Sequence, residues 1–306
     1  MQTTARSLIL DLLSTLRRGS MPVRALVEAG ALLGLEENNV RVSLARLCSS
    51  GRVERDERGR YRLGTAVAAI GARLRDWRAL DARTGPWNGG WIAVHSARLG
   101  RGPLRRRRER ALDLLGFREL EPGLALRPDN LRGGLPPVRE QLVALATDER
   151  SKDCALGRVF GLRGLDRESE TAARALWDTD ALTREAREAV GRLAESEGRL
   201  PTLTSEAAMV ESFRVGGAVL RQLMRHPLLP AEILDPAPLK ALVRAMRHYD
   251  RIGRDHWARF LARHDVPHRA LPLDAQAAHF GFEPLRSAVE PLSATSAPPT
   301  VETPRP

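Results

Sequence analysis

The first 64 residues carry a helix–helix–helix–hairpin pattern, and this pattern constrains the fold more than any other feature of the chain. Apolar residues recur at helical spacing over residues 4–17, again after Pro22, and again from Glu36 to Ser50. Gly51 ends the third segment, and residues 52–63 form the pattern of a short β-hairpin with Gly59 in its turn. This order of elements predicts a winged helix-turn-helix, a fold that places a helix in the major groove of DNA.

The third predicted helix has side chains that suit a major groove. Its inward face is fixed by Val40, Leu44 and Leu47, which recur at helical spacing. The opposite face and its flanks present amide, hydroxyl, small apolar and arginine side chains, which can contact base edges. The candidate DNA contacts on this helix are Asn38, Asn39, Arg41, Val42, Ser43, Arg46 and Ser49. The alternative is an ordinary solvated helix face in a winged helix that binds another protein.

Three arginines lie on or beside the predicted hairpin turn. Arg55, Arg58 and Arg60 are placed where they can reach phosphates or a minor groove. The distribution of charge agrees with a bound polyanion, because the net charge of +11 is carried by the first half of the chain. Residues 1–64 contribute +4 and residues 65–150 contribute +6, whereas residues 151–306 contribute +1.

The rest of the chain predicts two further domains and a tail. Strands are expected over 91–96, 117–121, 124–127 and 156–162, with helices over 103–115 and 137–147. This strand–helix–strand–strand–helix–strand order is that of a ferredoxin-like unit. Helices are then expected over 169–178, 183–197, 204–225 and 237–263, and a Pro/Ser/Thr-rich composition predicts disorder over 283–306. The expected fold is α+β, with a winged helix (1–64), a ferredoxin-like domain (65–165) and a helical domain (166–270).

Composition also excludes several classes of protein. No run of apolar residues is long enough to cross a bilayer, and the N-terminus does not have the pattern of a signal peptide, so we expect a cytoplasmic protein. The two cysteines, Cys48 and Cys154, do not suggest a disulfide framework or a zinc site. No convincing nucleophile triad is present, and we expect neither enzymatic activity nor a cofactor or metal.

Three stretches, in order along the chain, carry a resemblance to a known family. They are residues 6–13 with 34–35 and 39–47; residues 87–91, followed by an Arg-rich helix, 115–117 and 123–126; and residues 226–234. Over residues 5–265 the chain resembles the PaaX family, which are bacterial repressors of phenylacetate degradation operons. The resemblance implies a winged helix, a middle domain like the ferredoxin-like Cas2 fold and a C-terminal helical domain.

The resemblance further implies a homodimer on a double-stranded DNA operator and release by an aryl-CoA thioester such as phenylacetyl-CoA. The candidate effector contacts are Arg105, Arg108, Arg221, Arg225 and His226. The Arg-rich run at 105–108 has two other interpretations, namely a second contact to DNA phosphates or a solvated face balanced by neighbouring acidic residues. His226 is itself a departure from the family pattern, which tends to have an acidic residue there.

Two alternative functions follow from the same features. A regulator of this fold can act as an architectural or interaction protein without ligand control. A Cas2-like domain can also be a metal-dependent nuclease, but residues 95–100, which follow the first predicted strand, contain no carboxylate to bind a hard cation.

Overall fold

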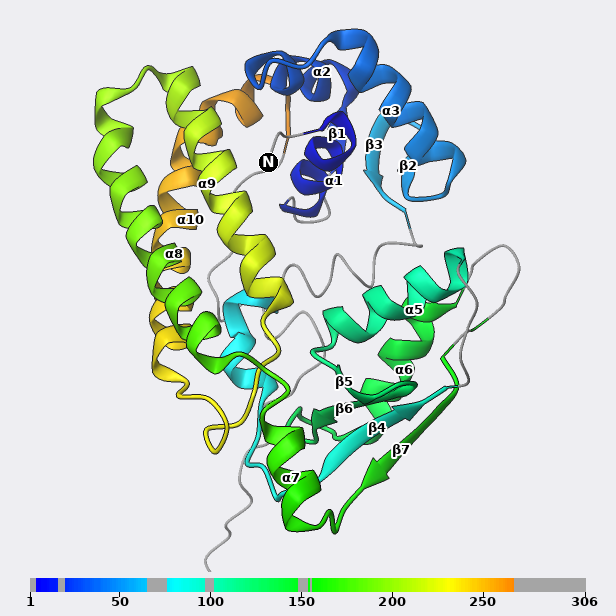
Figure 1. Ribbon diagram of the computed structural model, residues 1–306. Helices are drawn as coiled ribbons and strands as arrows, with labels where there is room; N and C mark the ends of the chain where they lie inside the picture. The colour runs from blue at the N-terminus through cyan, green and yellow to red at the C-terminus, as the bar shows by residue number, and fades with distance from the viewer. Residues whose placement is uncertain are drawn as a thin grey trace, which may run out of the picture. The chain divides into compact units, whose positions relative to one another are not determined.

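The computed structural model describes residues 4–15, 20–64, 76–96, 102–147, 154 and 156–266 (Figure 1). The chain divides into one compact unit over residues 1–268 and a second over 269–306. The predicted tail at 283–306 lies outside the described residues. Within the first unit the structure mixes helices with two antiparallel sheets, so the α+β class is confirmed.

The N-terminal segment, residues 4–64, contains the three predicted helices and the predicted hairpin. These elements are α1 (Ala5–Thr15), α2 (Val23–Leu32), α3 (Glu37–Ser49), β2 (Val53–Arg55) and β3 (Arg60–Leu63). A short strand that the sequence did not predict, β1 (Met21–Pro22), adds to β3, so the sheet order is β1-β3-β2. Pro22 thus ends a strand and directly precedes α2, whose first residue is Val23.

The three N-terminal helices pack through the face that periodicity predicts. Val40, Leu44 and Leu47 of α3 are all buried in a core with residues of α1 and α2. Gly30 lets α2 approach α3 closely, because a Cβ atom there would lie 2.7 Å from Cγ2 of Val40. The position of α3 therefore depends on a small residue in the neighbouring helix.

The central segment contains a four-stranded antiparallel sheet with the order β5-β6-β4-β7. Its elements are β4 (Trp91–His95), α5 (Pro103–Leu114), β5 (Arg118–Glu121), β6 (Leu124–Pro128), α6 (Leu135–Ala146) and β7 (Arg158–Leu162). The predicted order of strands and helices is present, and a short 3-10 helix, η1 (Asp76–Arg83), precedes it as an element that was not predicted. Helices α5 and α6 pack on the sheet face that contains Ile92 and Val94.

The opposite face of the sheet meets the C-terminal part of the chain. Trp91 on β4 stacks on Trp177 with ring centroids 6.2 Å apart, and it shares a core with Leu229. Four helices follow: α7 (Arg167–Arg174), α8 (Thr179–Arg199), α9 (Ser205–Arg225) and α10 (Ala237–Arg263), with the short η2 (Leu200–Thr202) between α8 and α9. Helix α8 begins four residues before its predicted start, because the Asp178 side chain caps it by accepting a hydrogen bond from the Ala181 N–H at 2.8 Å.

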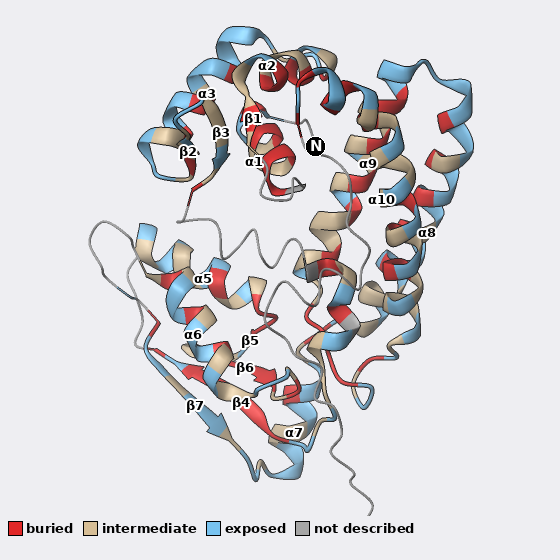
Figure 2. Ribbon diagram, turned by 180° about the vertical axis from the view of Figure 1, so that it is seen from behind, coloured by how far each residue is buried: buried red, intermediate tan, exposed pale blue. Residues whose placement is uncertain are grey.

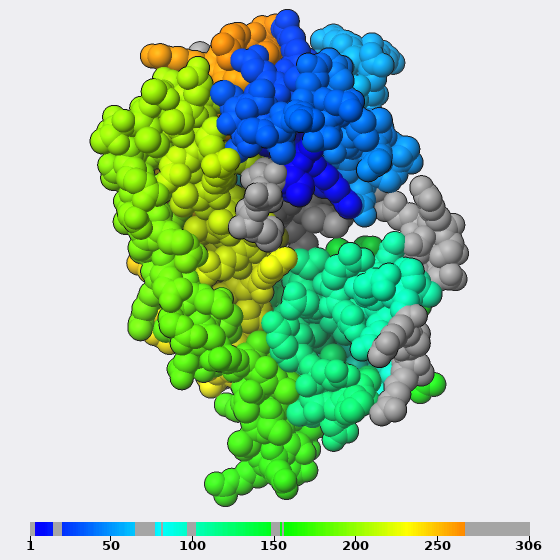
Figure 3. Space-filling model, turned by 45° about the horizontal axis from the view of Figure 1, so that its top comes forward, coloured from blue at the N-terminus to red at the C-terminus, as the bar shows by residue number. Residues whose placement is uncertain are grey.

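The N-terminal segment and the ends of α9 and α10 share one hydrophobic core. Met209, Trp257 and Phe260 belong to the same buried cluster as Leu8 and Ile9 of α1. Figure 2 shows the buried residues of the C-terminal helices, and Figure 3 shows the N-terminal segment directly beside α9. The helices at the two ends of the described chain therefore stabilise each other.

Ion pairs at the edge of this shared core join the same elements. The Glu28 carboxylate on α2 accepts a hydrogen bond from Arg263 at 2.5 Å and is hydrogen-bonded to Nε2 of the buried His264 at 2.9 Å. Arg221 on α9 pairs with Asp11 on α1 at 3.3 Å. These contacts fix α1 and α2, and through them α3, against the C-terminal helices.

Candidate nucleic-acid interface

The exposed face of α3 presents most of the predicted base contacts together. Six of the seven predicted α3 residues are exposed, and Ser43 is half-buried. The exposed residues are Asn38, Asn39, Arg41, Val42, Arg46 and Ser49. We call the whole predicted set, residues 38, 39, 41, 42, 43, 46 and 49, the reading face. Val42 is 40% exposed although it is a large apolar residue, and a thymine methyl group is a suitable contact for such a side chain.

The two arginines of the reading face are in different states. Arg41 donates to the Glu37 carboxylate at 2.6 Å, one helical turn earlier. Within the described part of the chain, the Arg46 side chain makes no hydrogen bond or ion pair. The Arg46 guanidinium is therefore available to donate two parallel hydrogen bonds to a guanine.

The hairpin turn between β2 and β3 is held by Asp56. Its carboxylate accepts hydrogen bonds from the backbone N–H groups of Arg60 at 2.8 Å and Arg58 at 3.0 Å, and these bonds hold the pKa of Asp56 below its ordinary value. Gly59 adopts the left-handed conformation that the turn requires, with φ of +73°. The side chains of Arg55 and Arg58 are exposed on this turn, as predicted.

Arg60 differs from the other two hairpin arginines. Its guanidinium donates to the Ser20 hydroxyl at 3.0 Å, to the Ser20 carbonyl at 2.9 Å and to the Asp265 carbonyl at 3.0 Å. Arg60 was predicted to reach DNA, but the structure uses it to tie the hairpin to the residues before β1 and after α10. The polar side chain of Ser20 and the carbonyls were not recognisable as its partners from the sequence.

The five predicted effector contacts do not converge on one pocket among the described residues. Arg105 pairs with Glu109, Arg221 pairs with Asp11, and Arg108 donates to the Ser96 hydroxyl. Arg225 is the exposed last residue of α9. The C-terminal end of α5 touches the residues after α9, since a Cβ atom on Gly116 would lie 2.8 Å from Cα of Pro227. Arg105 is ten residues before Leu115, so it lies about 15 Å along the helix from the end of α5 that touches the residues next to His226. The sequence showed that four of these residues are arginines, but it did not show which way their side chains point.

His226 is poorly suited to hold a phosphate in this structure. Burial lowers its pKa to about 4, so the imidazole is neutral near pH 7. Its Nδ1 atom accepts a hydrogen bond from the Leu228 N–H at 3.1 Å, inside a turn where Leu228 has a φ of +54°. His226 therefore stabilises a strained turn.

The pKa of His226 predicts how the stability of the protein depends on pH. The unfolded chain binds a proton at His226 near pH 6.5, whereas the folded protein does so only near pH 4. The stabilisation from the neutral imidazole is therefore complete above pH 6.5 and is lost as the pH falls from 6.5 to 4, by up to about 1.4 kcal/mol per pH unit. Urea unfolding at several pH values gives the free energy of unfolding, which should fall more steeply from pH 6.5 to 4 in wild type than in His226→Asn. The asparagine keeps an acceptor but does not titrate. Parallel pH profiles would contradict it.

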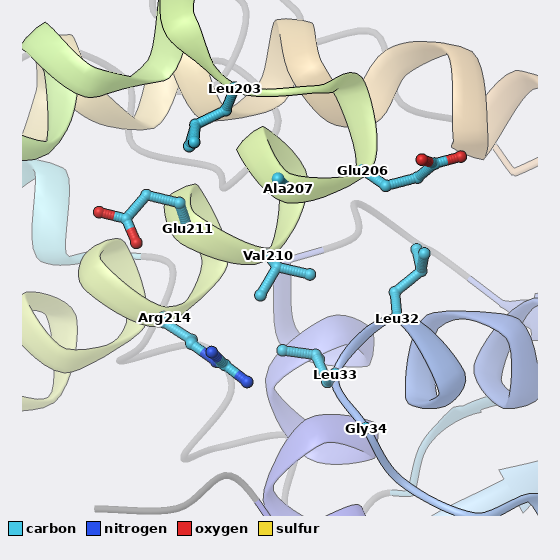
Figure 4. A pocket seen from close by; sticks show the side chains of 9 residues that line it. All are labelled: Leu32, Leu33, Gly34, Leu203, Glu206, Ala207, Val210, Glu211 and Arg214. Carbon is cyan, nitrogen blue, oxygen red and sulfur yellow. The ribbon is translucent and has the colours of Figure 1, made fainter.

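An open groove, which the sequence did not predict, lies between the end of α2 and the first turns of α9 (Figure 4). Its volume is about 530 Å³, and it is lined by Leu32, Leu33, Gly34, Leu203, Glu206, Ala207, Val210, Glu211 and Arg214. In Figure 4 the Val210 and Leu33 side chains face the space between the helices, and the Arg214 side chain extends along one end of it. Leu203 is 37% exposed. Its lining is mixed, with the charged side chains Glu206, Glu211 and Arg214 beside apolar ones.

The part of the chain that the structure describes offers neither a cluster of metal ligands nor a membrane-spanning helix. No group of three or more His, Cys, Asp or Glu side chains is arranged to hold a metal ion in the described part of the chain. None of the helices that the structure describes is long and apolar enough to cross a membrane.

The N-terminal segment is similar to a known protein family. The family model described as PaaX-like protein matches residues 4–67, and this confirms the predicted resemblance over the three helices and the hairpin. A solved structure similar to this chain is the uncharacterized protein Rv0674 from Mycobacterium tuberculosis. The two are 25% identical with a TM-score of 0.53, and the likeness covers 84% of this chain and 98% of the other. No curated protein matches the chain.

Proposed function

We propose that this protein is a DNA-binding transcription regulator of the PaaX type rather than an enzyme. The observation that carries the proposal is the reading face of α3, which is largely exposed, polar and arginine-bearing, within the segment that the PaaX-like family model matches. In this proposal residues 1–64 form a winged helix-turn-helix, residues 65–165 a ferredoxin-like domain of the Cas2 type, and residues 166–270 a helical domain. The order β5-β6-β4-β7, antiparallel throughout, supports the ferredoxin-like assignment.

The proposal includes a homodimer that represses transcription from an operator until an aryl-CoA thioester binds. A thioester releases DNA only if it binds one conformation of the protein more tightly than the other. The groove between α2 and α9 supports such control, because a ligand there contacts both the N-terminal segment and a C-terminal helix. Gel shifts on the gene's own upstream DNA, with and without phenylacetyl-CoA, separate the alternatives: indifference to thioesters favours an architectural protein, and metal-dependent cleavage of the probe favours a nuclease.

Arg46→Ala tests the reading face directly. Loss of a bidentate contact to guanine costs about 1–3 kcal/mol, so we expect operator affinity to fall by about 5- to 150-fold while affinity for random duplex DNA changes little. Fluorescence anisotropy with labelled upstream DNA and a random duplex of equal length measures both affinities. The control is Arg58→Ala on the hairpin, which should weaken both complexes equally because a phosphate contact does not read sequence. An equal loss on both duplexes for Arg46→Ala would remove it from base reading.

A further inference from the structure

Helix α5 carries five arginines in six positions, and the structure gives three of them internal partners. Arg105 pairs with Glu109 at 2.7 Å. Arg107 donates to the Thr147 carbonyl at 2.7 Å, and Arg108 donates to a hydroxyl of a neighbouring segment. These three side chains serve the fold of the central segment.

The other two arginines, Arg106 and Arg110, serve no such purpose. Both are exposed, and their spacing of four residues places them one turn apart on the outer face of α5. Neither makes a hydrogen bond or ion pair with any residue that the structure describes. Like charges at this spacing repel each other and destabilise a helix, so the pair is unfavourable for the free protein.

The acidic residues nearby do not neutralise this pair. Glu109 and Asp113 also lie on the outer face of α5, but each already has a partner. Glu109 is bound by Arg105, and Asp113 is bound by Arg118 at 3.0 Å. The outer face therefore keeps an excess of two positive charges from Arg106 and Arg110.

We infer that the outer face of α5 is a second DNA-binding surface, in which Arg106 and Arg110 contact phosphates of the duplex that α3 reads. The inference rests on the proposed DNA binding and extends its footprint to the central segment. About half to two-thirds of protein–DNA hydrogen bonds go to phosphate and sugar, and such contacts position the protein and carry no sequence information. The net charge of +6 over residues 65–150 favours the same polyanion.

The test is the salt dependence of DNA binding by the full chain. Each phosphate contact contributes about −0.9 to the slope of log K against log salt concentration, so Arg106→Gln with Arg110→Gln should make that slope less negative by about 2. Affinity for operator and for random duplex should fall by the same factor, so that the preference for operator is unchanged. The matched control is Arg184→Gln with Arg187→Gln, which removes the same charge from the exposed side of α8 and should leave the slope near the wild-type value.

Three outcomes overturn the inference. An unchanged slope in a folded α5 double variant that still binds DNA shows that these arginines do not touch phosphate. An equal change in the α8 control shows an effect of net charge alone. Calorimetric binding of coenzyme A that is lost in the α5 variant, with an unchanged DNA slope, assigns the two arginines to phosphates of a small molecule. Failure of the wild-type chain to bind any duplex instead contradicts the proposed function.

Discussion

Replacing Trp257 by alanine is expected to lower the free energy of unfolding by about 3–5 kcal/mol and to weaken DNA binding as well. Trp257 is 8% exposed and lies on α10, far along the chain from α3. Its ring packs against Phe213 and Phe260 at centroid distances of 5.9 and 5.4 Å, and its Nε1–H donates to the Met209 carbonyl at 3.2 Å. Because this cluster continues into the core of the N-terminal helices, a cavity here loosens the support of α3.

Urea unfolding followed by circular dichroism, together with anisotropy on operator DNA, measures both effects of Trp257→Ala. Trp257→Phe keeps most of the ring contacts but loses the hydrogen bond, so it should cost about 1 kcal/mol. A Trp257→Ala variant that unfolds at the wild-type urea concentration would contradict a core shared by the N-terminal helices and α10. Normal DNA binding by a destabilised variant would show that α3 does not depend on α10.

Arg127→Met is expected to destabilise the protein by about 3–5 kcal/mol, because it leaves buried acceptors without donors. The Arg127 side chain is 1% exposed, lies over the Phe117 ring, and donates to the carbonyls of Leu115 and Pro128 and to the Asn130 side chain. Asn130 in turn donates to the Leu228 carbonyl at 2.8 Å. This network joins β6 to the residues after α9, so its loss affects the contact between the central sheet and the C-terminal helices.

Thermal unfolding of Arg127→Met should show both a lower midpoint and a less cooperative transition. Arg132→Met is the matched control, since Arg132 is close in sequence but exposed, and it should change stability by no more than about 0.5 kcal/mol. Equal behaviour of the two variants would mean that the buried guanidinium contributes nothing beyond its volume.

Periodicity was sufficient to predict α3 and its inward face, because an amphipathic helix with Val40, Leu44 and Leu47 at helical spacing has one apolar side. Periodicity could not predict β1, because a strand of two residues has no period. It also could not predict η1, because the apolar residues of that short helix do not form a clear face. The sequence also predicted a helix over 237–263, but it did not show that Trp257 packs against the N-terminal helices. An apolar face has the same pattern whichever partner covers it.

The candidate site shows the same division between what is local and what is not. Exposure of Arg46 and Arg58 follows from the helix and turn that contain them, so the sequence could predict it. The hydrogen bonds of Arg60 to Ser20 and Asp265 depend on segments that meet only in the folded chain. The predicted effector contacts do not come together in the structure for the same reason. The directions in which the arginines of α5 and α9 point are decided by packing, which the sequence pattern does not show.

The core shared by the N-terminal helices and α10 also limits how this chain can be cut and recombined. A fragment ending after β3 would carry Leu8 and Ile9 without Met209, Trp257 and Phe260 to cover their cluster. The newly exposed apolar surface would favour aggregation over an independent DNA-binding module. A chimera with a different specificity must therefore exchange α1–α3 together with the facing turns of α9 and α10, although these segments are not contiguous in the sequence.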